Sequence, residues 1–96
     1  MDPEKTTIAT ADVVSSTAGR DQGQLFYVMD ADDQFVTLVN GRNRPVEKPK
    51  RKKRKHVEKV LRSETRVAEK LRSGDKVLNG ELRRDLAFLA REFASE

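Results

Sequence analysis

Short apolar runs separated by polar turns occupy residues 12–61 of the chain. Runs of five or six residues, rich in β-branched and aromatic side chains and bounded by glycine or aspartate, are typical of strands. Strands this short and this closely spaced favour a small barrel. The predicted strands are residues 12–16, 24–29, 35–39 and 56–61, with a short edge strand at 44–47, where Pro45 could not donate to an interior ladder.

Turn residues mark the connections between these runs. Gly19 and Gly23 lie in a turn over residues 17–23, and both can take the positive φ that tight turns need. Asn40-Gly41 ends the third strand and is a strong tight-turn signal. The acidic turn at 30–33 lacks the glycine and glutamate that an EF-hand requires at its sixth and twelfth positions, so we expect a hairpin turn there and no metal.

The apolar spacing becomes helical after residue 62. Ser63 is a candidate N-cap for a helix that ends near Leu71, before Ser73-Gly74, and Asn79 is a candidate cap for a second helix. A stripe at i, i+4, i+7 and i+11 on the second helix must be buried against the barrel, the first helix or a partner protein. We expect a helical hairpin. The stripe consists of Leu82, Leu86, Leu89 and Phe93.

Composition limits the size of the core. Apolar residues make up 35% of the 96-residue chain and charged residues 38%, whereas globular domains are usually about 45–50% apolar. Together with the strand and helix signals, this predicts a mostly β chain: a flexible N-terminus (1–11), a small barrel (12–61) and a helical extension of two short helices (63–96).

Several classes of function are disfavoured. The chain has no cysteine and one histidine, His56, so the sequence shows no disulfide framework, no thiolate metal site and no catalytic constellation. No apolar run is long enough to span a membrane, and the first residues do not resemble a signal peptide. We expect a cytoplasmic protein that is not an enzyme and needs no cofactor.

Positive charge is concentrated in one segment. Residues 48–62 carry nine basic residues and one acidic residue, a net charge of +8, whereas residues 1–47 carry −4 and residues 63–96 carry 0. Within it, the basic segment 48–56 holds seven lysines and arginines in nine positions. Such a run favours binding to a polyanion by release of counterions. A solvated linker and a nuclear import signal are the alternative interpretations.

The ordered set Ala18, Gly19, Arg20, Asp21 and Gly23, followed by an apolar strand ending in Asp30, resembles a KOW motif. It is most similar to large-subunit ribosomal proteins of archaeal and eukaryotic type. The similarity continues through the strand at 35–39 and Gly41 to the basic stretch that closes on Lys55-His56-Val57, and it covers about residues 12–61. Phe26 stands where many KOW motifs, including those of elongation factors, have a further glycine.

This resemblance implies an SH3-like barrel that binds structured RNA, with ribosomal RNA as the expected partner and a ribosome-associated role in translation. It singles out Arg20, with Gly19 and Gly23 shaping the loop, and arginine can bind phosphate bidentately. Arg20 could instead pair with Asp21, and Arg42 and Arg44 could be ordinary loop charges. The candidate RNA-binding residues are Gly19, Arg20, Gly23, Arg42, Arg44, Lys48, Lys50, Arg51, Lys52, Lys53, Arg54, Lys55 and His56.

Two other functions remain open at this point. The barrel and the amphipathic C-terminal helix could act as a protein-interaction adaptor, with a ribosomal or other protein docking on the helix. The chain could also be a transcription-linked KOW protein that binds DNA. Among the aromatic residues, strand alternation places Phe26 in the core and Tyr27 on the other face, and Tyr27 and Phe35 are candidates for base stacking. We expect recognition of backbone and shape to dominate over stacking.

Overall fold

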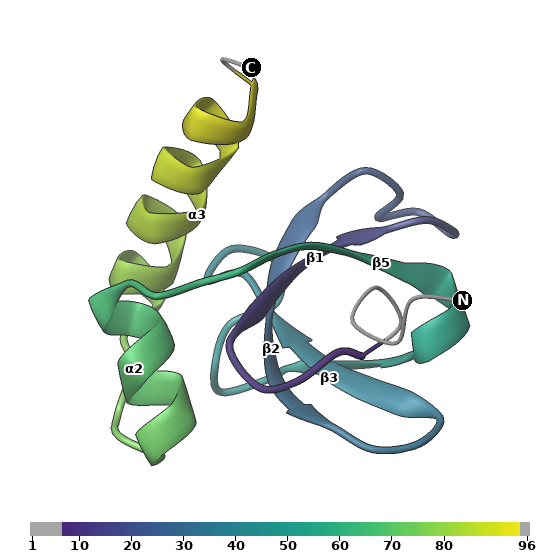
Figure 1. The fold of residues 1–96 in the computed structure, drawn as a ribbon, viewed down its shortest axis with the longest axis horizontal. Helices are drawn as coiled ribbons and strands as arrows, with labels where there is room; N and C mark the ends of the chain where they lie inside the picture. The colour runs from purple at the N-terminus through teal and green to yellow at the C-terminus, as the bar shows by residue number, and fades with distance from the viewer. Residues whose placement is uncertain (1–6, 95–96) are drawn as a thin grey trace.

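The computed structural model describes residues 7–94, excluding the side chains of the last two of these. Five antiparallel strands form one sheet in the order β4-β3-β2-β1-β5, and two helices follow (Figure 1). The predicted mostly-β fold with a C-terminal helical pair is confirmed, and it is compatible with a small barrel. The elements are β1 (Asp12–Ser16), β2 (Leu25–Ala31), β3 (Phe35–Val39), β4 (Lys50–Lys53), the 3-10 turn η1 (Arg54–His56), β5 (Val57–Arg62), α2 (Arg66–Ser73) and α3 (Asn79–Ala94).

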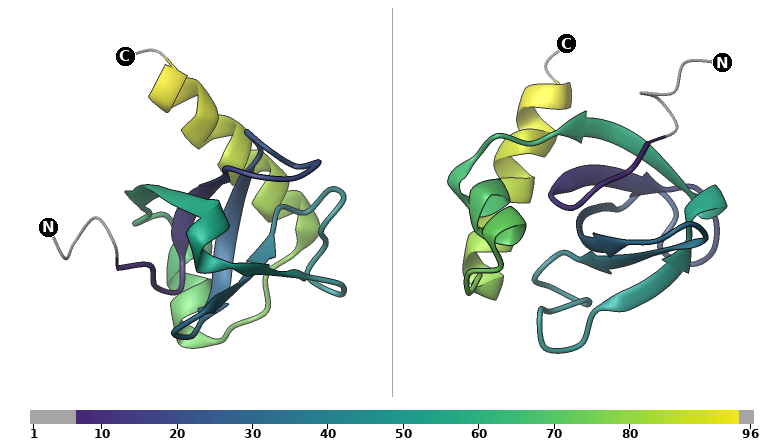
Figure 2. Two further views of the ribbon diagram at one scale, coloured as in Figure 1. Left: turned by 90° about the vertical axis from the view of Figure 1, so that its right-hand side faces the viewer. Right: turned by 60° about the horizontal axis from the view of Figure 1, so that its bottom comes forward.

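The sheet curves around an interior core, and both helices lie outside it (Figure 2). Alternate residues of each strand point inward, as the twofold period of a strand requires. On β2 these are Phe26 and Val28, and both are fully buried, as predicted for Phe26. The interior core consists of Ile8, Val14, Phe26, Val28, Val36, Leu38 and Val57.

The helices cover part of the outer face of the sheet and form a second core there. Tyr27, whose side chain points away from the interior, is fully buried under them. This burial on both faces explains why residues 25–29 form a continuous apolar run instead of alternating with polar residues. The outer core consists of Ala11, Val13, Tyr27, Val39, Val67, Ala68, Val77, Leu82 and Leu86.

The described part of the apolar stripe of α3 thus packs against both the barrel and α2. Leu82 and Leu86 pack in the outer core, and Leu89 packs at its margin. The prediction of a helical hairpin therefore accounts for only part of the packing of α3, because α3 also packs against the sheet. The side chain of Phe93 lies outside the described residues.

A polar network fastens the helices to the sheet. The Tyr27 hydroxyl donates a hydrogen bond to the carboxylate of Asp85 on α3 and lies 2.8 Å from Ser63 Oγ. Thr65 Oγ1 donates to the same carboxylate at 2.8 Å. Burial and the Asp85 hydrogen bond raise the pKa of Tyr27 to about 12. The hydroxyl is satisfied where burial would otherwise be costly.

The helix ends differ from the prediction in their capping residues. Thr65, not Ser63, caps α2 by accepting a hydrogen bond from Ala68 N, because Ser63 is buried beside Tyr27. Gly74 ends α2 with a φ of 78°, as its place after Ser73 indicated. The side chain of Asn79 does not cap its own helix. Its Oδ1 accepts a hydrogen bond from Val46 N at 2.9 Å and so ties α3 to the loop before β4.

Two predictions about the barrel need correction. Residues 44–47 are not an edge strand, because Asn40 Oδ1 accepts hydrogen bonds from the backbone of Arg42 and Arg44 and holds a longer loop, residues 40–49, in place. The strand that pairs with β3 at that edge of the sheet is β4, inside the basic segment itself. Residues 7–11 were predicted to belong to a flexible N-terminus, yet Ile8 is buried in the interior core. Residues 1–6 lie outside the described residues.

Candidate nucleic-acid interface

The basic segment is divided into two faces because half of it is a strand. In β4, Lys52 pairs with Val36 and Lys50 with Leu38, two residues of the interior core. The side chains of both lysines are therefore directed to the inner face of the sheet, and Lys52 is only 8% exposed. Arg51 and Lys53 alternate with them and are exposed. The two lysines on the inner face thus differ from the rest of the segment.

Both inner lysines bind one buried carboxylate. Asp21 is 5% exposed and accepts hydrogen bonds at 2.7 Å from Lys52 Nζ and from Ser16 Oγ. Its other oxygen, Oδ2, lies 3.2 Å from Lys50 Nζ as an ion pair without hydrogen-bond geometry. Lys52 also donates to the carbonyl of Ala18 at 2.8 Å. We call Asp21, Ser16, Lys50 and Lys52 the Asp21 clamp.

Electrostatics keep Asp21 ionised. Burial alone would raise the pKa of its carboxyl, but the hydrogen bonds from Lys52 and Ser16 and the ion pair with Lys50 outweigh burial and hold the pKa far below its usual range. A buried charge is tolerated when it is paired and hydrogen-bonded in this way. Lys50 and Lys52 are consequently committed to a carboxylate inside the fold.

The clamp fixes the glycine loop, residues 17–23, against β4. Gly19 and Gly23 take φ values of 85° and 87°, as the predicted turn required. A Cβ on Gly19 would lie 3.7 Å from both Asp21 Oδ1 and Lys52 Nζ, so the loop backbone runs close to the clamp. Thr17 N donates to the carbonyl of His56 at 2.9 Å and joins the loop to η1 as well.

Arg20 stays on the outside of this loop. Its side chain is exposed, and within residues 7–94 it forms no ion pair, so the suggested pairing with Asp21 is not formed. Asp21 turns inward to the lysines of β4 instead. The side chain of Arg20 is therefore exposed to solvent, while the Asp21 clamp holds the backbone of its loop in place.

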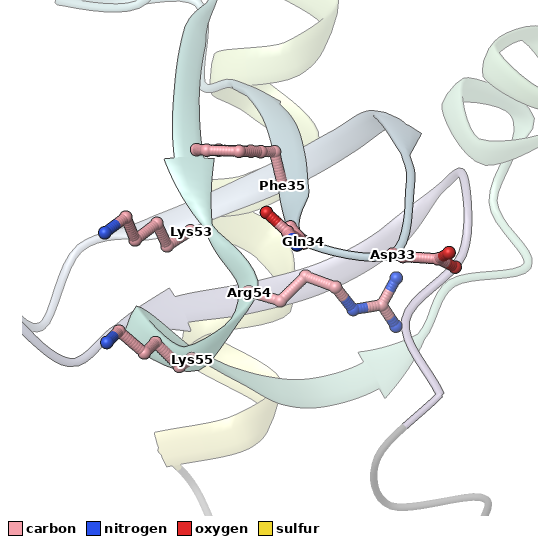
Figure 3. Close-up of a pocket in the computed structure, with 6 residues that line it drawn as sticks. All are labelled: Asp33, Gln34, Phe35, Lys53, Arg54 and Lys55. Carbon is pink, nitrogen blue, oxygen red and sulfur yellow. The ribbon is translucent and has the colours of Figure 1, made fainter.

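The outer face of β3, β4 and η1 forms a shallow pocket of about 400 Å³ (Figure 3). Phe35 provides its aromatic surface, and the guanidinium of Arg51 lies over the Phe35 ring, 4.1 Å from its centroid. Arg54 Nη1 donates to the carbonyl of Asp32 at 2.7 Å, at the edge of the same region. The residues lining the pocket are Asp33, Gln34, Phe35, Lys53, Arg54 and Lys55.

The remaining candidates lie in the loop over residues 40–49 and in η1. Arg42 is exposed and lines a separate shallow pocket with Arg83 of α3, so it sits beside the helix. Arg44 is half-buried in the turn that Asn40 organises, whereas Lys48 is exposed just before β4. His56 is half-buried in η1, and its carbonyl binds the glycine loop.

Sequence reasoning missed the role of Asp21, although a signal was present. Asp21 lies between two turn glycines, and Lys50 and Lys52 are two positions apart in a later segment. If that segment is a strand, both lysines lie on one face and can bind the same carboxylate. Treating residues 48–56 as a uniform run concealed that alternation.

In chemical terms, the surface offers cations and a partly exposed aromatic ring. Within residues 7–94, no three histidine, aspartate or glutamate side chains gather as a metal site would require. Neither helix of the described chain has the length and apolar character needed to cross a membrane. No protein-family model and no curated protein matches the chain.

Proposed function

We propose that this protein binds structured RNA through the glycine loop, β4 and η1. One observation carries the proposal: the Asp21 clamp uses two lysines to lock the glycine loop onto the basic strand and leaves exposed cations around that junction. Among the described residues, Arg20, Lys48, Lys53 and Lys55 are exposed and form no ion pair. We call these four residues the cationic face.

The mechanism is electrostatic capture by a surface that is already ordered. Each phosphate that the cationic face neutralises releases condensed counterions, which favours binding at low salt. Arg20 can form a bidentate contact with a phosphate, while the lysines act as compact point charges. Because the clamp holds the loop, little backbone conformational entropy is lost when Arg20 binds.

RNA is favoured over other polyanions by the resemblance of residues 12–61 to the KOW family, most closely to ribosomal proteins. Because of that resemblance, ribosomal RNA is the partner to test first. The setting we propose is a ribosome-associated role in translation, in the cytoplasm. A rigid cationic surface on a small barrel suits the phosphates and shape of a folded RNA.

The rival function as a protein-interaction adaptor loses part of its basis. It depended on an apolar helical stripe available to a partner, and Leu82 and Leu86 are buried in the outer core. Leu78 and Phe88 do remain exposed on the helical part. Affinity purification with and without nuclease treatment separates a protein partner from an RNA partner.

The test is a salt titration of equilibrium binding to a folded ribosomal RNA fragment, with duplex DNA of equal length as competitor. For four phosphate contacts, we expect log K to fall against log [salt] with a slope of roughly −3 to −4. Replacing Lys53 and Lys55 with alanine should reduce that slope by roughly 1.5. Substitution is preferable to deletion of the segment, because deletion would remove β4 from the sheet.

The matched control is the double variant Arg66→Ala/Lys76→Ala, which removes the same charge from exposed positions on the helical part. It should bind with the wild-type slope. Equal losses in both double variants would mean that net charge alone determines binding, and the proposed surface would be wrong. Preference for duplex DNA over the RNA would point to the transcription-linked alternative.

A further inference from the structure

The aromatic side chain of Phe35 is partly exposed to solvent. It lies on the same face of β3 as Val39, because the two are four positions apart in a strand. Val39 is covered by the helices in the outer core, but Phe35 lies roughly 13 Å farther along the strand. The helical cover does not include Phe35, which is half-buried in the pocket wall.

Arg51 makes this ring part of an organised surface. It is one position from the clamp lysines and points to the other face of β4, where its guanidinium stacks on Phe35. Asp32 Oδ2 lies 3.4 Å from Arg51 Nη2, and Asp32 Oδ1 accepts hydrogen bonds from the backbone of Gln34 and Phe35. The turn that begins β3 thus holds both the ring and the arginine.

The pocket beside the ring has the size and polarity of a small-ligand site. Its volume of about 400 Å³ lies within the usual range of about 300–1,000 Å³ for such pockets. Lys53 and Lys55 lie on one side of it and Asp33 on the other (Figure 3). A phosphate is therefore favoured on the lysine side. Gln34 carries both a donor and an acceptor that can face the edge of a base.

We propose that this pocket binds one unpaired nucleotide of the RNA, with its base stacked against Phe35 and its phosphate beside Lys53 and Lys55. The inference rests on the proposed function, since it assigns a subsite within the RNA surface. It adds a preference that the cationic face cannot supply, because phosphate contacts alone do not distinguish paired from unpaired nucleotides. Stacking on aromatic and arginine planes is how proteins select unpaired bases.

The test compares a fully paired RNA hairpin with the same hairpin carrying one bulged nucleotide. Wild type should bind the bulged RNA roughly tenfold more tightly, the gain typical of stacking one base. Phe35→Ala should remove that preference and leave affinity for the paired hairpin within about twofold. Phe88→Ala is the control, since it truncates another aromatic, 48% exposed, on α3.

Two further variants make the test independent of folding defects. The chain contains no tryptophan, so Phe35→Trp introduces a single fluorophore that can still stack. Its emission should be quenched by the bulged RNA and not by the paired hairpin. Arg51→Lys keeps the charge but removes the planar group, and it should reduce the preference for the bulge while leaving the salt slope unchanged.

The outcomes separate the two proposals. Tight, salt-dependent binding of both hairpins with equal affinity, unaffected by Phe35→Ala and without tryptophan quenching, would overturn the nucleotide subsite alone. Failure to bind either hairpin at low salt would overturn the proposed RNA-binding function together with the subsite. A bulge preference that Phe88→Ala removes and Phe35→Ala retains would place the subsite on the helix and contradict the assignment.

Discussion

Replacing Asp21 with asparagine tests the Asp21 clamp directly. Asparagine has nearly the same shape and can still accept a hydrogen bond from Ser16, but it leaves Lys52 buried without a counterion. Removing one partner of a buried ion pair costs about 3–5 kcal/mol. Lys50 has a side chain that is 28% exposed and can regain water. We therefore expect a loss near the lower limit, about 3 kcal/mol of unfolding free energy.

This loss is large for a domain of this size. A chain of 96 residues has a total stability of roughly 5–14 kcal/mol. The variant should still fold, with its midpoint of thermal unfolding lowered by roughly 15 °C. Urea and thermal unfolding followed by circular dichroism at pH 7 measure both quantities. A double-mutant cycle with Lys52→Met should give a coupling of about 2 kcal/mol, because the double variant leaves no unpaired charge at the center of the clamp.

The pH dependence supplies an independent check on the same residue. The pKa of folded Asp21 lies below its ordinary value of 3.8, so the stability it contributes is fully present above that value and is lost as pH falls below it. The stability gap between wild type and Asp21→Asn should therefore narrow below about pH 4. A gap smaller than 1 kcal/mol at pH 7, or one that stays constant down to pH 2.5, would refute the clamp.

Three other substitutions and one control examine how the helices are attached to the barrel. Gly41→Ala should destabilise the fold by at least about 2 kcal/mol, because φ is 76° and a Cβ would meet the backbone oxygen of Asn79; urea unfolding measures this. Tyr27→Phe should cost about 1–3 kcal/mol by removing a buried hydroxyl from Asp85. Because the pKa of Tyr27 is raised to about 12, the stability that its hydroxyl contributes is present below pH 10 and is lost as pH rises towards 12. Urea unfolding over this pH range should show that the unfolding free energy falls less steeply with pH in the variant than in wild type. Leu82→Ala should cost about 2–5 kcal/mol and expose α3 to hydrogen exchange, whereas Leu78→Ala, at an exposed position, should change stability by less than about 0.5 kcal/mol.

Local sequence signals were sufficient for most of the barrel. Strands β1, β2, β3 and β5 consist of apolar or alternating runs, and the glycines between β1 and β2 and after β3 take positive φ in the structure. The continuous apolar run at 25–29 also indicated more than a strand. It indicated burial on both faces, and therefore a layer that would cover the barrel from outside.

The features that were missed depend on tertiary contacts. Strand β4 has the composition of a solvated segment, and it becomes a strand because β3 offers a ladder and Asp21 offers a counter-charge. Lys52 looks identical to Lys53 in the sequence, and only the register against Val36 makes one buried and the other exposed. Likewise, serine is a residue type that often caps helices, but Ser63 is hydrogen-bonded to the Tyr27 hydroxyl. Thr65 therefore caps α2 instead.

The most direct measurement of the central claim is ultraviolet cross-linking of the purified chain to a folded ribosomal RNA fragment, followed by mass spectrometry of the cross-linked peptides. The account predicts cross-links at the glycine loop, at Phe35 and between Lys53 and His56, and a lower yield of these cross-links in the Lys53→Ala/Lys55→Ala variant. Cross-links confined to α3, or none at low salt with a correctly folded protein, would contradict it.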